Sequence, residues 1–158
     1  MSEDARFSDG VERPLRLVAR DEEDLKVLSA LVQDAVFPAS EMLWRPGERR
    51  FAILLNRFRW EDKPAAERRG RDFERVQAVL DFEDVTGVAS QGVVRDADTV
   101  LSLLSLEWEA GEDGTGALVL TLAGDGAIKV DVEALEVILR DVTRPYRAPS
   151  RKAPEHDG

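Results

Sequence analysis

From residue 76 onward, apolar side chains recur at every second position in one segment after another. The alternating residues are Val76, Ala78, Leu80 and Phe82, then Val88 with Val94, Leu104 with Leu106 and Trp108, Leu118 with Leu120 and Leu122, and Ile128 with Val130 and Val132. A period of two is typical of a strand that buries one face. Between two of these segments, Gly124-Asp125-Gly126 is typical of a hairpin turn. Short turns join antiparallel strands, so the pattern predicts a mainly antiparallel sheet.

Two segments have the 3.6-residue spacing of amphipathic helices. The first begins at Asp21, whose carboxylate can accept hydrogen bonds from free N–H groups, and Pro38 ends it. The second begins at Asp131 and ends at Pro145. Each carries its apolar residues on one side, so each is expected to pack against the sheet.

The first half of the chain also predicts three strands and one exposed connection. A short strand is expected over residues 15–19, and Pro46-Gly47 marks a tight turn between strands near 41–45 and 50–60. Residues 61–72 contain no large apolar side chain, so they are expected to form an exposed connection.

These elements predict one α+β domain over residues 14–146. A strongly twisted, mainly antiparallel sheet is covered by the two amphipathic helices. The alternative is a barrel-like sheet closed by the C-terminal helix. Residues 1–13 and 147–158 lack periodicity and are expected to form a flexible lead and tail.

The composition excludes several classes of chemistry. The chain of 158 residues has no cysteine, which excludes disulfides, thiolate nucleophiles and zinc–thiolate or iron–sulfur sites. Its single histidine, His156, lies in the polar tail, where it cannot be held in a catalytic triad. The composition therefore favours a protein that is not an enzyme and that binds no cofactor. No apolar run of membrane-spanning length and no signal peptide is found, which favours a cytoplasmic protein without a membrane partner.

Charge is distributed unevenly along an acidic chain of net charge −10. Residues 45–75 hold ten Lys and Arg against six Asp and Glu, whereas residues 76–139 hold two against thirteen. The overall acidity disfavours nucleic acid, but the basic segment could form a local anion site. The alternative is that the basic segment pairs with the acidic half inside the fold.

The densest mix of polar and aromatic residues lies at the end of the strand expected over 50–60. Arg57 and Arg59 project to one face, where they could hold a carboxylate or phosphate with forked N–H donors. Trp60 projects to the other face and could stack on a ligand. The structural alternative is that the arginines pair within the fold and the rings belong to the core. The candidate binding residues are Asn56, Arg57, Arg59, Trp60, Glu61 and Arg75.

Other polar clusters give weaker signals. The basic residues Arg68, Arg69, Arg71 and Arg75 could contact RNA phosphates, but no nucleic-acid motif accompanies them. Asp96 and Asp98 have a spacing typical of metal ligands but lack the continuing ligand loop of a calcium site, so no metal site is predicted among the carboxylates. They are Asp81, Glu83, Asp84, Asp96, Asp98, Glu107 and Glu109.

Four stretches resemble a family of small bacterial proteins catalogued as domain of unknown function 2948. They are LRLVARDEEDLKVLSALVQDAV, RRFAILLNRFRWE, RVQAVLDFEDVTGVASQGV and LTLAGDGAIKVDVEALEVILRDV, which together span Leu15 to Val142. The resemblance implies a self-contained bacterial cytoplasmic domain. It brings no catalytic residue or ligand with it.

The leading functional hypothesis is a non-enzymatic protein-interaction or regulatory module. It would bind an acidic protein partner through the Arg57 and Arg59 face and the 61–75 connection. The alternative is a protein that binds a small anionic ligand, or a carboxylate-dependent enzyme, with stacking on Trp60 or Trp44. RNA binding through residues 61–75 is a weaker alternative. A sheet edge could also pair between copies, so a homo-oligomer is compatible with the sequence.

Overall fold

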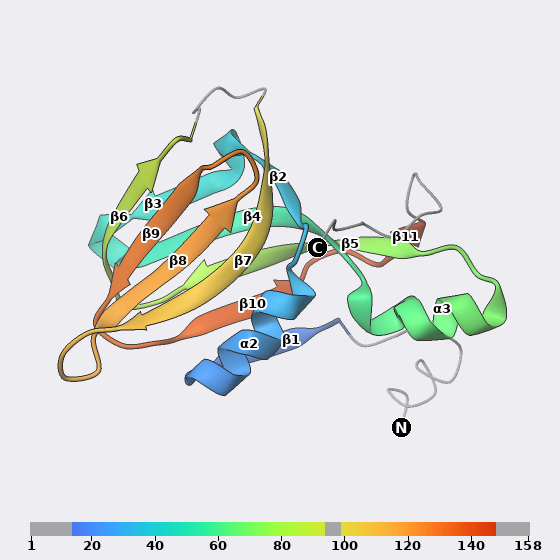
Figure 1. Cartoon of the computed structure of the whole chain (residues 1–158), viewed down its shortest axis with the longest axis horizontal. Helices are drawn as coiled ribbons and strands as arrows, with labels where there is room; N and C mark the ends of the chain where they lie inside the picture. Colours follow the sequence, from blue (N-terminus) through green and yellow to red (C-terminus); the bar gives the residue numbers. More distant parts are fainter. Residues whose placement is uncertain (1–13, 94–98, 148–158) are drawn as a thin grey trace.

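The computed structural model describes residues 14–93 and 99–147 of the chain (Figure 1). These residues form one antiparallel sheet of eleven strands and two α-helices, so the predicted α+β class is confirmed. The sheet is not closed into a barrel, so the barrel-like alternative is wrong. No helix in the described ranges is long and apolar enough to cross a membrane.

The elements follow one another with short connections. The helices are α2 (Glu22–Leu31) and α3 (Lys63–Arg69), with 3-10 helices η1 (Ala39–Glu41), η2 (Pro46–Glu48) and η3 (Trp60–Asp62). The strands are β1 (Arg16–Ala19), β2 (Val36–Pro38), β3 (Met42–Arg45), β4 (Arg50–Phe58), β5 (Glu74–Phe82), β6 (Val85–Gln91), β7 (Val100–Ala110), β8 (Gly116–Leu122), β9 (Ala127–Val132), β10 (Val137–Asp141) and β11 (Tyr146–Arg147). Their order in the sheet is β1-β10-β5-β4-β2-β7-β8-β9-β6, with β3 paired to β4 and β11 to β5.

The sheet curls so that its two halves face each other across one core. Figure 1 shows β7, β8 and β9 in front of β4 and β5, with α2 beside β1 and β10. Buried residues of both halves, such as Leu80 and Leu118, belong to the same hydrophobic cluster. Helix α2 packs against β1 and β7 through the buried Leu25 and Leu28. It therefore covers the core where the two halves diverge.

The period of two correctly identified the core residues of three strands. On β5, the four predicted residues from Val76 to Phe82 have no exposed surface, and the predicted apolar positions of β8 and β9 are also buried. The buried residues of β7 do not alternate strictly, because the register of β7 with β8 shifts between Leu103 and Ser105. This irregularity buries Leu101, Leu103 and Leu106 and leaves Leu104 only half-buried.

The first helix starts as predicted and ends early. The Asp24 N–H donates to the Asp21 carboxylate over 2.8 Å, which confirms the predicted cap. The helix ends at Leu31, and Asp34 adopts a left-handed φ of 64°. Residues 36–38, predicted to be helical, instead form β2 between β4 and β7. The predicted turn at Pro46-Gly47 is confirmed, as η2 between β3 and β4.

The predicted C-terminal helix is wrong. The segment continues β9 to Val132 and then forms β10, which pairs with β5 on one side and β1 on the other. Val137 and Leu139 are buried at the spacing of two that is typical of a strand. The apolar residues of this segment therefore fit a strand as well as they fit a helix. Backbone pairing on both sides outweighs the local preference for a helix.

The second helix lies where an exposed connection was predicted. Helix α3 begins with Lys63-Pro64 and ends at Gly70, which has the left-handed φ of 65° typical of a helix terminus. Its one buried residue, Ala66, is too small to give an apolar stripe. This is why the residues of α3 look like an exposed connection.

Some predicted features lie outside the described residues. They are the N-terminal lead 1–13, residues 148–158 of the tail with His156, and the internal residues Val94, Asp96 and Asp98. Arg147, predicted to be in the tail, belongs to β11, where it lies opposite Glu74 of β5 in the sheet.

The β7–β8 hairpin predicts a sharp dependence on one glycine. A Cβ added at Gly116 would meet the Glu109 carbonyl oxygen and lie 2.5 Å from the Trp108 ring. We expect Gly116→Ala to lower the free energy of unfolding by about 1–3 kcal/mol in chemical denaturation. The matched control is Gly47→Ala, which meets nothing within 4 Å and should change stability little. Equal effects of the two substitutions would contradict this packing.

Candidate functional site

Arg57 lies at the end of β4 and is completely buried. It continues the inward-facing series Phe51, Ile53 and Leu55, so the period of two places its guanidinium in the interior. Its Nη1 and Nη2 donate to the two Glu61 carboxylate oxygens over 2.9 and 2.8 Å. Its Nε and Nη2 donate to Asp141 over 3.0 Å each.

Two bidentate pairs compensate for burial of this charge. Burial by itself lowers the pKa of Arg57, but the hydrogen bonds to Glu61 and Asp141 outweigh it and the net shift is upward. At Glu61, burial raises the pKa, and the hydrogen bonds from Arg57 reverse that shift and lower it. Arg57 and Glu61 are therefore both ionised near neutral pH.

Arg59 extends this cluster toward α3. It is also buried, and its guanidinium bonds to Glu74 and lies 3.6 Å from the Asp62 carboxylate. Arg71 donates to both oxygens of Asp62 over 3.0 Å, and this hydrogen bonding lowers the pKa of Asp62. We call this cluster the Arg57 network; its members are Arg57, Arg59, Arg71, Glu61, Asp62, Glu74 and Asp141.

The expectation that Arg57 and Arg59 form an accessible face is wrong. Both guanidiniums are buried against carboxylates of the same chain, which is the alternative considered from the sequence. An external anion would have to displace Glu61 or Asp141 to reach Arg57. Partner binding by the predicted residues stays a prediction, and the geometry assigns their arginines a structural role.

The remaining predicted residues are engaged with one another or with the core. The Trp60 indole N–H donates to the Gln33 carbonyl over 3.0 Å, and its ring packs edge-on to Phe58. The Arg75 guanidinium donates to the Asn56 side-chain oxygen over 3.1 Å and lies 5.9 Å from the centre of the Phe58 ring. Asn56 in turn donates to the hydroxyl of Tyr146, and partial burial lowers the pKa of Arg75. Trp60 is therefore not a free stacking surface.

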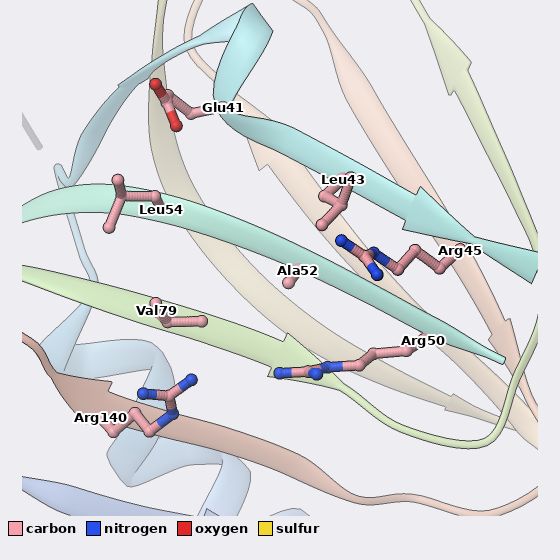
Figure 2. Close-up of a pocket in the computed structure, with 8 residues that line it drawn as sticks. All are labelled: Glu41, Leu43, Arg45, Arg50, Ala52, Leu54, Val79 and Arg140. Atoms are coloured by element: carbon pink, nitrogen blue, oxygen red, sulfur yellow. The ribbon is translucent and has the colours of Figure 1, made fainter. Parts of the chain in front are cut away.

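A different group of residues forms a cavity of about 350 Å³ on the outer face of the sheet (Figure 2). The face belongs to β3, β4, β5 and β10, on the side away from the core. In the sheet register, Leu43 lies beside Ala52, and Leu54 lies beside Val79. The cavity, here called the outer-face cavity, is lined by Glu41, Leu43, Arg45, Arg50, Ala52, Leu54, Val79 and Arg140.

Three guanidinium groups line part of the edge of this cavity. Figure 2 shows Arg45 and Arg50 on one side of Ala52 and Arg140 beside Val79, with the Glu41 carboxylate at the opposite edge. Arg50 is held in place by hydrogen bonds and ion pairing with the buried Asp81, at 2.7–2.8 Å. Within residues 14–93 and 99–147, Arg45 forms an ion pair with the exposed Glu48 alone, and Arg140 forms none. An external carboxylate would therefore reach Arg140 directly and would compete with Glu48 for Arg45.

Sequence reasoning missed this cavity. Arg140 was assigned to the end of a helix, and the face exists only once β10 pairs with β5. The available signal was the outward position of Arg45 and Arg50 on either side of the Pro46-Gly47 turn. Trp44, which lies between Leu43 and Arg45, faces the opposite side of β3 and lines another cavity.

The carboxylates singled out in the sequence do not assemble a metal site. No group of three or more potential ligands occurs within the described residues. Glu107 and Glu109 are exposed on β7. Asp81 and Glu83 are close enough to share a proton: burial, then the hydrogen bond to Asp81, raises the pKa of Glu83 to about 7.

The Arg57 network predicts a large effect of a single substitution. Arg57→Met leaves Asp141, a nearly buried carboxylate, without its cation, so we expect stability to fall by about 3–5 kcal/mol. Arg140→Met is the matched control, because Arg140 is an exposed arginine on β10 next to Asp141, and it should stay within about 0.5 kcal/mol of the wild type. Urea denaturation of both variants measures the difference. A loss below about 1 kcal/mol for Arg57→Met would contradict the structural role.

The Asp81–Glu83 pair predicts a pH dependence of stability. The pKa of Glu83 is about 7 when folded and returns to its lower usual value on unfolding. Between these values the folded state holds the extra proton, so this group makes stability fall as pH rises. Glu83→Gln cannot titrate, so its stability relative to wild type should increase from about pH 5 to about pH 8. Denaturation midpoints at several pH values test this, and a constant difference would count against the pair.

The comparisons with known proteins identify a family but no activity. No curated protein and no solved structure matches the chain significantly. The family described as protein of unknown function (DUF2948) matches residues 15–156, which is most of the chain and includes the Arg57 network and the outer-face cavity. The protein belongs to the DUF2948 family, whose function is unknown.

Proposed function

We propose that this protein is a non-enzymatic interaction module that binds an acidic segment of a partner protein in the outer-face cavity. The observation that carries the proposal is the group of Arg45, Arg50 and Arg140 at the edge of an apolar floor, on a chain of net charge −10. A positive patch selects acidic partners, while the net negative charge of the chain opposes association between copies.

The chemistry of the cavity favours a segment with both carboxylates and apolar side chains. Leu43 is 48% exposed, which leaves apolar surface for a partner to cover. Guanidinium groups bind carboxylates through two parallel N–H donors, and Arg50 is already oriented by Asp81. In the register of the sheet, Arg16 on β1 lies beside Arg140 and extends the positive rim. An acidic peptide lying across the strands would contact these groups in succession.

A second candidate is a small anionic ligand, because the cavity volume of about 350 Å³ falls within the range of small-molecule sites. A carboxylate-dependent enzyme has less support. Glu83 has a pKa suited to proton transfer, but it is not among the residues that line the cavity.

Site-specific photo-crosslinking tests the proposed surface. A photoreactive amino acid in place of Leu43 should crosslink the partner in native lysate, and the crosslinked peptide should be rich in Asp and Glu. The matched control places the same group at Val27, which is 54% exposed on α2, away from the cavity. Equal crosslinking from both positions, or a crosslinked peptide without acidic residues, would contradict the proposal.

Charge reversal provides the second arm of this experiment. Arg45→Glu with Arg140→Glu should abolish crosslinking at Leu43 while the thermal unfolding temperature stays near that of wild type. Arg68→Glu with Arg69→Glu makes the same change of charge on α3 and should leave crosslinking intact. Loss only in the α3 variant, together with nuclease sensitivity, would support the weaker RNA alternative. Thermal stabilisation by a small anion, without a crosslinked protein, would support the second candidate.

A further inference from the structure

The curled sheet fails to close between β3 and β6. Strand β6 is the last in the sheet order and pairs with β9 alone, whereas β3 pairs with β4 alone, in the described part of the chain. At one end, β6 is held to the connection between η2 and β4, because the Val85 N–H donates to the Arg49 carbonyl oxygen over 2.8 Å. No strand pairing joins β3 to β6 within the described residues. The result is a gap that begins at Val85 and continues toward Ser90.

A second cavity, of about 320 Å³, lies in this gap. We call it the β3–β6 gap; it is lined by Ala39, Ser40, Met42, Trp44, Phe51, Val88, Ser90 and Ile128. None of these side chains is charged, and six of the eight are apolar. The lining therefore differs from the arginine-rich outer-face cavity, and its chemistry suits an uncharged ligand.

Apart from one register irregularity, between Val85 and Gly87, the edge of β6 lacks the features that protect an open sheet edge. Such edges usually carry charges or proline, or are very short. At the other end of the sheet, β1 has only four residues and carries Arg16. Strand β6 has seven residues, VTGVASQ, with no charge and no proline. An edge of this kind is a template for pairing with another extended chain.

We infer that the β3–β6 gap binds an extended, uncharged segment of a partner protein, which adds to β6 as a further strand. The backbone of the segment would pair with the edge of β6, and alternate side chains would lie on Trp44 and Val88. A strand is the occupant that uses both features of the gap, because it supplies backbone hydrogen bonds to an edge and apolar side chains to a neutral lining. This surface is separate from the one proposed for the acidic segment.

A displayed library of random nonapeptides is a suitable probe, because it assumes no particular sequence. Selection on the full chain should enrich peptides with alternating Val, Ile, Thr or aromatic residues and few charges. Binding of an enriched peptide should slow amide hydrogen exchange across residues 85–91, as strand addition requires.

Two adjacent substitutions separate the gap from the rest of β6. Ser90→Arg puts a charge into the gap and should weaken peptide binding about tenfold or more. Ala89→Arg is the matched control, because Ala89 is exposed and projects to the opposite face of the strand. Ser40→Arg blocks the gap from the other side and serves if Ser90→Arg does not fold.

The proposal is overturned by any of three results. One is a library that enriches no peptide on wild type over the blocked variants. Another is equal loss of binding in Ala89→Arg and Ser90→Arg. The third is that a small apolar dye binds the wild type but neither blocked variant, while the library enriches no peptide. That result would make the gap a small-molecule site. Concentration-dependent dimerisation that Ser90→Arg abolishes would instead identify a second copy of the chain as the occupant.

Discussion

The buried Arg57 guanidinium is the interaction on which the arrangement of the chain's middle depends. It joins the end of β4 to Glu61 in the neighbouring η3 and to Asp141 at the end of β10, 84 residues further along the chain. Because a charge in the interior is costly without partners, this site tolerates one arrangement of the three elements. Arg59 and Arg71 extend the same constraint to α3. The basic segment of the chain thus serves mainly to attach α3 to the sheet.

Neutralising these arginines inside the fold changes which charges face solvent. Carboxylates of the Arg57 network neutralise part of the excess positive charge of residues 45–75. Other arginines remain exposed on the outer face of β3, β4, β5 and β10. There, Arg50 is oriented by Asp81, and Arg140 is contributed by β10, outside the basic segment. The functional proposal therefore keeps the acidic partner expected from the sequence but moves it to a different surface.

The curl of the sheet has a second consequence, because it brings two edges near each other without joining them. Strand β6 contacts the connection between η2 and β4 at Val85, and no pairing joins β6 to β3 within the described residues. A closed barrel would have paired both edges, whereas the observed sheet leaves a neutral gap. The protein thus has two surfaces of different chemistry, one positive and one uncharged.

Local patterns in the sequence predicted the elements well where one periodicity was unambiguous. The buried alternation from Val76 to Phe82 and the cap at Asp21 needed no knowledge of distant residues. Prediction failed at residues 131–145, where apolar spacing suited either a helix or a strand, and at α3, whose only buried residue is Ala66. In both places the choice depends on neighbours that a local pattern does not contain.

The sequence by itself determined the α+β class, the antiparallel strands, the lack of cysteine chemistry and the family, since each depends on residue type or on local spacing. Only the tertiary structure decided which arginines are available. Arg57 and Arg140 look equally basic in the sequence, but the strand register turns Arg57 inward onto two carboxylates and Arg140 outward into a cavity. Burial and pairing depend on contacts between distant segments, so charge patterning along the chain could indicate an acidic partner but could not locate its surface.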